Sequence, residues 1–189
     1  MQRTKRLFAA VKIQSQQGFL TTFNHIKNAL GKERITWVNP DNMHLTIKFF
    51  GDTYNNQIPA IDQCLKAATS EMKVIELDIC NTGMFGSKYQ PRVIWFGIED
   101  GNQLQRLFLK VSGQLQTIGI YPDRQNFVPH LTIGRIKEIR DKKAFQQVLD
   151  DYGKHHAGRQ RIDELVLYES ILRREGPLHI PVQRYKLRA

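Results

Sequence analysis

The tetrapeptide His-Leu-Thr-Ile occurs twice in this chain, beginning at residue 44 and again at residue 130. Each copy lies in an apolar segment of the kind that predicts a β-strand. Residues two apart on a strand point to the same side, so each copy places an imidazole beside a hydroxyl while its Leu and Ile point into a core. We expect the two strands to face each other and to bring His44, Thr46, His130 and Thr132 into one pocket.

Two histidines and two threonines in one pocket suit the cleavage of a phosphodiester. The pKa of an unperturbed histidine is about 6.5, so near neutral pH one imidazole can accept a proton while the other donates one. Each such transfer typically accelerates a reaction by about 10²–10⁴-fold. The threonine hydroxyls can donate hydrogen bonds to the phosphate oxygens as negative charge develops on them. This chemistry requires no metal ion or cofactor.

The hydrophobic pattern elsewhere predicts interleaved helices and strands. Gly51 and Asp52 are expected to end the first motif strand, and a segment containing Gly83, Gly86 and Pro91 is expected to separate two later strands. The expected helices are 18–30, 56–72, 104–118 and 141–152, and the expected strands are 7–11, 35–38, 43–50, 74–79, 92–98, 128–136, 162–172 and 180–187.

Several of these strands follow one another with no helix between them. This order favours antiparallel or mixed sheets, and therefore an α+β fold, over a doubly wound parallel sheet. The sequence strand, helix, motif strand occurs in both halves. A chain of 189 residues is long enough to bury a substantial core, either as one large domain or as two small lobes that share it.

The composition indicates which kind of binding partner and which cellular compartment to expect. Lys and Arg (28 residues) exceed Asp and Glu (18 residues), and the net charge of +10 favours a polyanionic partner such as nucleic acid. Cys64 and Cys80 match no metal-binding or C-x-x-C spacing, so we expect reduced core residues in a cytoplasmic protein. The apolar run 7–11 is too short for a signal peptide, and no apolar stretch is long enough to span a membrane.

The motifs and their surroundings resemble a known family. Segments 43–51 and 129–135 are similar to the paired H-x-T-x signatures of the 2H phosphoesterase superfamily, and more narrowly to those of the RNA 2′,3′-cyclic phosphodiesterases, also called 2′-5′ RNA ligases. Segments 6–10, 91–97 and 167–170 resemble further strands of that family. The resemblance implies that residues 1–189 form one bilobal, pseudo-symmetric α+β domain, with mixed or antiparallel sheets lining a central cleft and helices on the outside.

The same resemblance implies an activity and a set of roles. Members hydrolyse an RNA 2′,3′-cyclic phosphate to a 2′-phosphomonoester, and a related activity joins RNA ends through a 2′-5′ linkage. By motif position His44 is the proton donor and His130 the proton acceptor, an assignment that spacing alone does not make. Thr46, Thr132 and Arg135 hold the phosphate. The expected partners are RNA with 2′,3′-cyclic phosphate ends or cyclic nucleotides, acted on by a monomer with no obligate protein partner, metal or cofactor.

Two basic residues beside the motifs leave alternatives open. Arg135 lies five residues after His130 and would point away from it on a regular strand. A bulge at Gly134 would turn Arg135 back toward the phosphate, and without one it would form a salt bridge on the outer face. Lys48 has the same parity as His44, and it either contacts phosphate or lies in solvent at the rim.

Other aromatic and basic residues are further candidates for contact with RNA. Phe8, Phe50 and Phe127 are candidates for stacking on a nucleobase, and the alternative for each is a place in the core. Arg173, Arg174 and the basic tail 184–188 either attract RNA or are ordinary solvated charges. No role is assigned to the remaining histidines, which are His25, His155, His156 and His179.

Two other functions fit the sequence less well. A binding module of the same fold would hold a nucleotide or RNA without turning it over, but the presence of both motif histidines favours an enzyme. A metal-dependent hydrolase would use the histidines as ligands, yet no cluster of carboxylates or cysteines supplies further ligands at a recognised spacing. Turnover in the presence of a strong chelator separates all three.

Overall fold

The computed structural model describes residues 3–87, 89–122, 127–174 and 176–189. The strands are β1 (Thr4–Lys12), β2 (Arg34–Trp37), β3 (His44–Tyr54), β4 (Ile75–Gly86), β5 (Pro91–Glu99), β6 (His130–Glu138), β7 (His156–Ile162), β8 (Glu164–Ile171) and β9 (Leu178–Lys186). The α-helices are α1 (Gln17–Ala29), α2 (Ile58–Thr69), α3 (Gln103–Gln116) and α4 (Lys142–Asp151), and short 3₁₀ turns cover Pro40–Asn42 and Asn55–Gln57.

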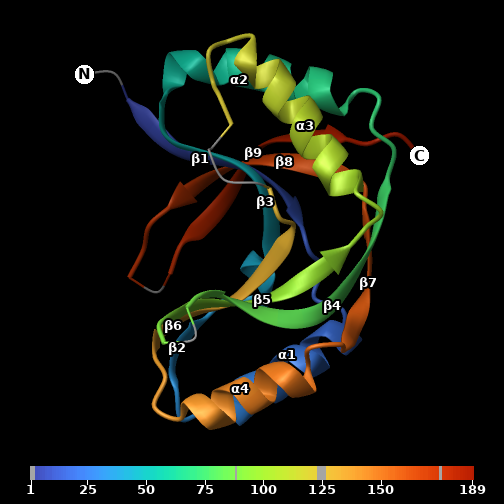
Figure 1. Cartoon of the computed structure of the whole chain (residues 1–189). Helices are drawn as coiled ribbons and strands as arrows, with labels where there is room; N and C mark the ends of the chain where they lie inside the picture. Colours follow the sequence, from blue (N-terminus) through green and yellow to red (C-terminus); the bar gives the residue numbers. More distant parts are fainter. Residues whose placement is uncertain (1–2, 88, 123–126, 175) are drawn as a thin grey trace.

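The strands form two sheets, each with helices on its outer side. One sheet has the order β3-β1-β8-β9 and the other has the order β2-β6-β5-β4-β7. Throughout the described ranges, the pairs of named strands are antiparallel. Helices α2 and α3 cover the first sheet, whereas α1 and α4 cover the second (Figure 1). The α+β fold expected from the sequence, with antiparallel sheets inside and helices outside, is confirmed.

Strand β1 lies inside the first sheet and is buried on both faces. Leu7, Ala9 and Val11 belong to the main apolar core, whereas Phe8 and Ala10 belong to a smaller cluster on the opposite face. Alternate residues of a strand point to opposite sides, so a continuous apolar run is what a strand covered on both faces requires. The expected strand 7–11 is therefore the centre of a longer one.

Helix α1 packs on its sheet through one apolar face. Its buried side chains include Phe19, Phe23 and Ile26, which recur at helical spacing on one face. A helix of this length is only marginally stable alone in water, and burying each large apolar side chain contributes about 1.5–3 kcal/mol. Packing on the sheet therefore stabilises the helix. Within the described ranges, no helix is both long and apolar enough to cross a membrane.

Two of the expected interruptions do not end their strands. Strand β3 continues through Gly51 and Asp52 to Tyr54, because Gly51 adopts a φ of +72° at a register shift in the pairing with β1. A glycine in this conformation is typical of a β-bulge, which bends a strand without ending it. The prediction that Gly51 and Asp52 end the strand was wrong.

Strand β4 likewise extends well past the expected end at residue 79. Gly83 lies inside it, opposite Trp95 of β5. A Cβ at Gly83 would lie 2.3 Å from the Trp95 ring. A residue without a side chain is therefore required at this position of β4, where the indole lies against the backbone. The expected separating segment is in fact part of a β-hairpin.

Strand β7 was not predicted. It is an edge strand that pairs with β4, and its sequence alternates between buried and exposed residues only after Gly158, where the register shifts. The buried member Gln160 is polar, and its side chain accepts from the backbone N–H of Gln14 and donates to the Gln14 carbonyl. A short, polar strand of this kind lacks the hydrophobic alternation that sequence analysis detects.

Candidate active site

Both motif strands carry a β-bulge at the same place. In the pairing of β1 with β3, Ala10 lies opposite Thr46 and Ala9 lies opposite Lys48, so Ile47 is the extra residue. Ile47 and Lys48 are consecutive, yet both are buried. The bulge therefore reverses the alternation of side chains immediately after the motif.

The second motif strand repeats this arrangement. In the pairing of β5 with β6, Trp95 lies opposite Thr132 and Ile94 lies opposite Gly134, which makes Ile133 the extra residue. Ile133 and Gly134 are both buried. A side chain at Gly134 has no room, because a Cβ there would lie 2.7 Å from Ile35. The sequence predicts a possible bulge at Gly134, and the structure has one directly beside it, with Ile133 as the extra residue.

The bulges decide which side chains reach the cleft. Arg135 returns to the side of His130 and lines the cleft, and it forms no salt bridge with any residue of the described ranges. In the first motif strand Phe49, not Phe50, returns to the side of His44. The choice of Phe50 as a stacking candidate is corrected: its ring packs against the main core, because the sequence-based parity ignored the bulge.

One cleft of about 770 Å³ gathers the residues of both motifs. His44 and Thr46 enter it from the first sheet, and His130, Thr132 and Arg135 enter it from the second. Within the described part of the chain, neither threonine hydroxyl is held in a hydrogen bond to another residue. The other walls include Phe8, Phe49, Phe108, Phe127, Leu172 and His179.

The two imidazoles are held by equivalent hydrogen bonds. Nδ1 of His44 lies 2.6 Å from the carbonyl oxygen of Asn42, and Nδ1 of His130 lies 2.7 Å from the carbonyl oxygen of Val128. A carbonyl oxygen only accepts, so each Nδ1 carries a proton and donates it. This fixes the tautomer and leaves Nε2 of each ring as the nitrogen that can exchange a proton with a ligand.

The pKa of His44 is lowered from its usual value. Burial is the main cause, because desolvation penalises the charged imidazolium, and the positive charge of Arg135 acts in the same direction. The hydrogen bond to the Asn42 carbonyl opposes both. In the unliganded cleft, His44 is therefore biased toward its neutral form.

A group of aromatic rings surrounds His44. Phe8 is 3% exposed, and its ring centroid lies 4.9 Å from that of His44 and 5.2 Å from that of Tyr168. Phe8 therefore packs against the His44 ring and supports it. Because the Phe8 ring is buried, it offers no free face to a nucleobase. His179, which sequence analysis left without a role, also lines the cleft and packs edge-on against His44. A lone histidine with no repeated motif gives no sequence signal of this position.

Aromatic rings line the cleft at two other places, one exposed and one partly buried. Phe49 is 44% exposed, and the Arg6 guanidinium lies 4.9 Å from its ring centroid. Phe127 stacks on Phe108, with ring centroids 4.6 Å apart and an angle of 7° between the planes. Phe108 and Phe49 were both missed, the first because it belongs to the apolar pattern of α3 and the second because of the bulge.

The other basic candidates occupy different settings. Lys48 is 7% exposed and its Nζ donates to the Tyr121 carbonyl at 3.0 Å, so it is not a solvated lysine at the rim. In the basic tail, Arg184 pairs with Glu164, and Lys186 lies 3.1 Å from Asp163. These acidic neighbours reduce the attraction of the tail for a polyanion. Arg173 and Arg174 are exposed at the end of the β8–β9 hairpin.

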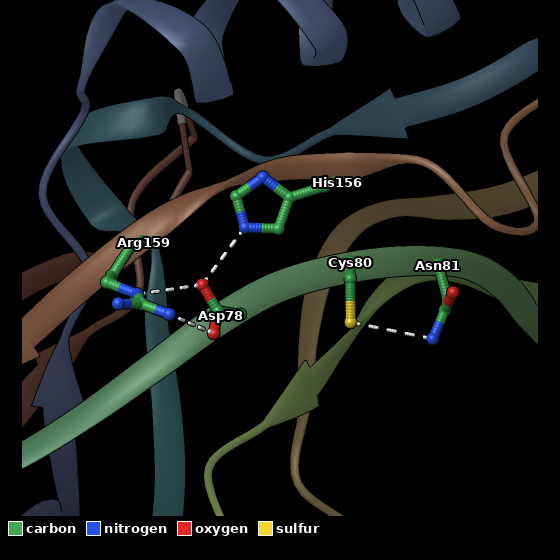
Figure 2. A network of polar contacts seen from close by, with 5 residues as sticks. All are labelled: Asp78, Cys80, Asn81, His156 and Arg159. Atoms are coloured by element: carbon green, nitrogen blue, oxygen red, sulfur yellow. Dashed lines mark hydrogen bonds and ion pairs between the residues drawn. The ribbon is translucent and has the colours of Figure 1, made fainter.

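A second polar cluster, shown in Figure 2, lies outside the cleft. Asp78 of β4 accepts two hydrogen bonds of 3.0 Å from Arg159 of β7 and another from His156, and these partners lower its pKa to about 2. Burial, followed by Glu99, raises the pKa of the neighbouring Cys80 thiol to about 11, so the thiol remains protonated at neutral pH. We interpret this cluster as a link between two strands.

The two cysteines, and the histidines other than His44, His130 and His179, lie outside the cleft. Cys64 and Cys80 are buried and unpaired, as predicted. His155 contacts the hydroxyl of Thr22 at 3.0 Å, and His25 is exposed on α1. Across the described ranges, no group of three or more His, Cys, Asp or Glu side chains is placed to hold a metal ion.

The chain matches a known protein family over most of its length. A model described as LigT-like phosphoesterase matches residues 11–95 and 97–179. The chain belongs to the LigT-like phosphoesterase family. The resemblance to 2H phosphoesterases found in the sequence is thereby confirmed.

Curated relatives match most of this chain. An RNA 2′,3′-cyclic phosphodiesterase of Methanothermobacter thermautotrophicus is 27% identical over 96% of this chain and 98% of its own length. A protein of the same name from Aquifex aeolicus is 31% identical over 80% of this chain and 81% of its own length.

Solved structures agree on the fold. The protein TT0787 of Thermus thermophilus superposes with a TM-score of 0.78 at 20% identity, covering 97% of this chain and 98% of that one. E. coli LigT complexed with 3′-AMP gives a TM-score of 0.74 at 21% identity, covering 98% and 99%. At these identities the likeness shows a shared LigT-like fold.

Proposed function

We propose that this protein hydrolyses the 2′,3′-cyclic phosphate at RNA ends to a 2′-phosphomonoester, using His44 and His130 as an acid–base pair. One observation carries the proposal. Two imidazoles from different sheets line the same cleft, and each is fixed through Nδ1 so that Nε2 is the nitrogen left for proton transfer. Family membership and the names of the two curated relatives support the same activity.

The proposed reaction is a displacement at phosphorus. Water attacks the phosphorus atom and gives a proton to Nε2 of neutral His130, while the bond from phosphorus to O3′ breaks and O3′ takes a proton from protonated His44. The product carries a 2′-phosphate and a free 3′-hydroxyl. His44 ends neutral and His130 ends protonated, and exchange with solvent restores both. Each transfer is expected to contribute about 10²–10⁴-fold to the rate.

Thr46, Thr132 and Arg135 are proposed to hold the phosphate. Their side chains line the same cleft as the histidines, and the two hydroxyls and the guanidinium can donate to the non-bridging oxygens. An arginine fork suits this task because it can donate two parallel hydrogen bonds to one phosphate. Removing one well-placed donor of this kind costs about 10²–10³-fold in rate.

The role of His44 as the acid depends on the bound anion. In the free cleft, burial and Arg135 lower the pKa of His44, which favours the neutral ring. The negative charge of a bound cyclic phosphate favours the imidazolium and raises that pKa again. We infer that His44 takes up its proton when the substrate binds.

The wider cleft supports an RNA substrate rather than a bare phosphate ester. The exposed ring of Phe49 and the partly buried Phe108–Phe127 pair line the cleft and provide aromatic surface on which bases can stack. Since each sheet supplies one histidine, we propose that residues 1–189 act as one bilobal domain and that a monomer suffices. The unpaired cysteines support a cytoplasmic location. We propose that ligation through a 2′-5′ linkage uses the same displacement in the same direction: an RNA 5′-hydroxyl attacks phosphorus in place of water, gives its proton to His130, and O3′ leaves with a proton from His44.

A short RNA ending in a 2′,3′-cyclic phosphate tests the proposal. We expect complete conversion to the 2′-phosphate in the presence of EDTA, identified by ³¹P NMR, and loss of conversion in His44→Ala and His130→Ala. His25→Ala, an exposed site outside the cleft, is the matched control. A 3′-phosphate product, inhibition by EDTA that zinc or manganese reverses, or binding without turnover would each refute the proposal.

A further inference from the structure

The β8–β9 hairpin forms one wall of the cleft and is connected to His44. This hairpin projects from the first sheet toward the side of the second sheet (Figure 1). Leu172, Pro177 and His179 are among the cleft-lining residues it supplies. The side chain of Asn42 donates to the Pro177 carbonyl at 3.1 Å. The carbonyl of the same Asn42 accepts the hydrogen bond from Nδ1 of His44. One residue therefore contacts both the hairpin and the ring of His44.

His179 provides a second, direct contact between the hairpin and His44. Its ring centroid lies 5.0 Å from that of His44, with an angle of 82° between the planes. It also lies 4.9 Å from the ring of Phe8, which in turn is 4.9 Å from His44. The three rings thus contact one another in a closed triangle, and Tyr168 stacks on Phe8 with ring centroids 5.2 Å apart. Because the His44 ring is packed against the other two rings, it has little freedom to rotate.

The charge state of His179 suits packing better than proton transfer. Burial, and then the charge of His44, lowers the pKa of His179 to about 4. Tyr168 on β8 also lies near His179, with ring centroids 6.3 Å apart, and Arg135 on β6 acts on the charge of His44. Arg6, Lys48 and His130 line the same cleft. At neutral pH His179 is therefore an uncharged imidazole packed against the ring of His44.

We propose that His179 is a positioning residue for His44: it holds the ring with Nε2 toward the cleft and keeps water from its flank, so that His44 becomes charged when the phosphate binds. The catalytic consequence rests on the proposed function, whereas the effect on His44 itself does not. The competing role is direct action of a His179 nitrogen on the substrate.

Two substitutions separate these roles. His179→Phe keeps an aromatic ring against His44 and Phe8 but removes both nitrogens, whereas His179→Ala removes the ring. We expect His179→Ala to lower kcat by about 10²-fold, the cost of a misplaced reacting group. We expect His179→Phe to retain most of kcat with a pH–rate profile close to that of the wild type.

The titration of His44 provides a readout that needs no substrate. In imidazole-detected ¹H–¹⁵N spectra, His179→Ala should raise the pKa of His44 because water reaches its flank. His179→Phe should leave that pKa close to the wild-type value, and His25→Ala should change neither the titration nor kcat. Thermal unfolding of each variant checks that the fold persists, and His179→Phe keeps the test decisive if His179→Ala does not fold.

Two results would overturn the inference. An equal loss of kcat in His179→Phe and His179→Ala, with an unchanged pKa of His44, would mean that a His179 nitrogen acts on the substrate directly. Unchanged titration of His44 in His179→Ala would mean that the ring does not control its environment. If none of the proteins turns over cyclic phosphate, the proposed function fails and the titration alone decides the role of His179.

Discussion

Phe49 and Arg135 occupy equivalent positions in the two halves of the fold. Each is the third residue after a motif threonine, and each is turned toward the cleft by the bulge that follows the motif. The equivalent strands therefore present different chemistry: an aromatic ring from the first sheet and a guanidinium from the second. We propose that this asymmetry makes a nearly symmetric pair of motifs bind a ligand in one direction, with its phosphate toward Arg135 and a base toward Phe49.

Replacement of Arg135 should affect both binding and the charge of His44. We expect Arg135→Met to lower kcat/KM by about 10²–10³-fold, because a donor to the phosphate is lost. In the free protein, it should also raise the pKa of His44, since a neighbouring positive charge that disfavours the imidazolium is removed. Steady-state kinetics and NMR titration measure the two effects. A His44 titration that does not move would show that Arg135 lies too far away to act on it.

Adjacent phenylalanines should give opposite results. Phe49→Ala should raise KM for RNA by an amount that corresponds to about 1–3 kcal/mol of lost stacking, with little change in stability, because the ring is 44% exposed. Phe50→Ala should lower the free energy of unfolding by about 2–4 kcal/mol, since its ring packs against the core. Kinetics and urea denaturation of both variants make the comparison. The reverse pattern would mean that β3 has no bulge at Ile47.

The two motif histidines should be needed for turnover but not for folding. A glutamine at position 44 or 130 keeps a polar group near the place of Nε2 but cannot transfer protons. His44→Gln and His130→Gln should each lower kcat by about 10²–10⁴-fold. The wild-type pH–rate profile should be bell-shaped, and each variant should lose one limb of it. Circular dichroism controls for the fold, and near-normal kcat in either variant would remove that residue from the mechanism.

Gly83 tests the packing that supports the second motif strand. A Cβ at this position would lie 2.3 Å from the Trp95 ring, and Trp95 lies opposite Thr132 in the sheet. Gly83→Ala should therefore lower the free energy of unfolding by about 1–3 kcal/mol through overpacking. Gly113→Ala, on the exposed side of α3 with nothing within 4 Å, is the matched control and should stabilise by about 0.5–1 kcal/mol. Equal effects of the two substitutions would contradict the packing observed.

The sequence was sufficient for the parts of the site that depend on local pattern. The repeated tetrapeptide identified His44 and His130, because period-two alternation on a strand is visible in one dimension. The same alternation failed after the first motif, since a bulge leaves no clear mark when the extra residue is an ordinary isoleucine, whereas Gly134 indicated a possible bulge after the second motif. His179 was missed for a different reason: its contact with His44 joins strands that are distant in sequence, and only the folded chain brings them together. The site residues that the sequence did not reveal depend on how the strands pair and pack in the folded chain, and not on residue type alone.

The low pKa of His179 should make the protein sensitive to acid. In the unfolded chain this histidine titrates near 6.5, whereas in the folded protein burial lowers its pKa to about 4. Between these values the unfolded state binds a proton that the folded state does not, so stability should fall as the pH is lowered from about 6.5 to about 4. His44 contributes in the same direction, because its pKa is also lowered. His179→Phe should weaken this dependence and His25→Ala should not, as measured by urea midpoints at pH 7 and pH 4.5. A His179→Phe protein that loses as much stability as the wild type over this interval would show that His179 is already protonated in the folded state.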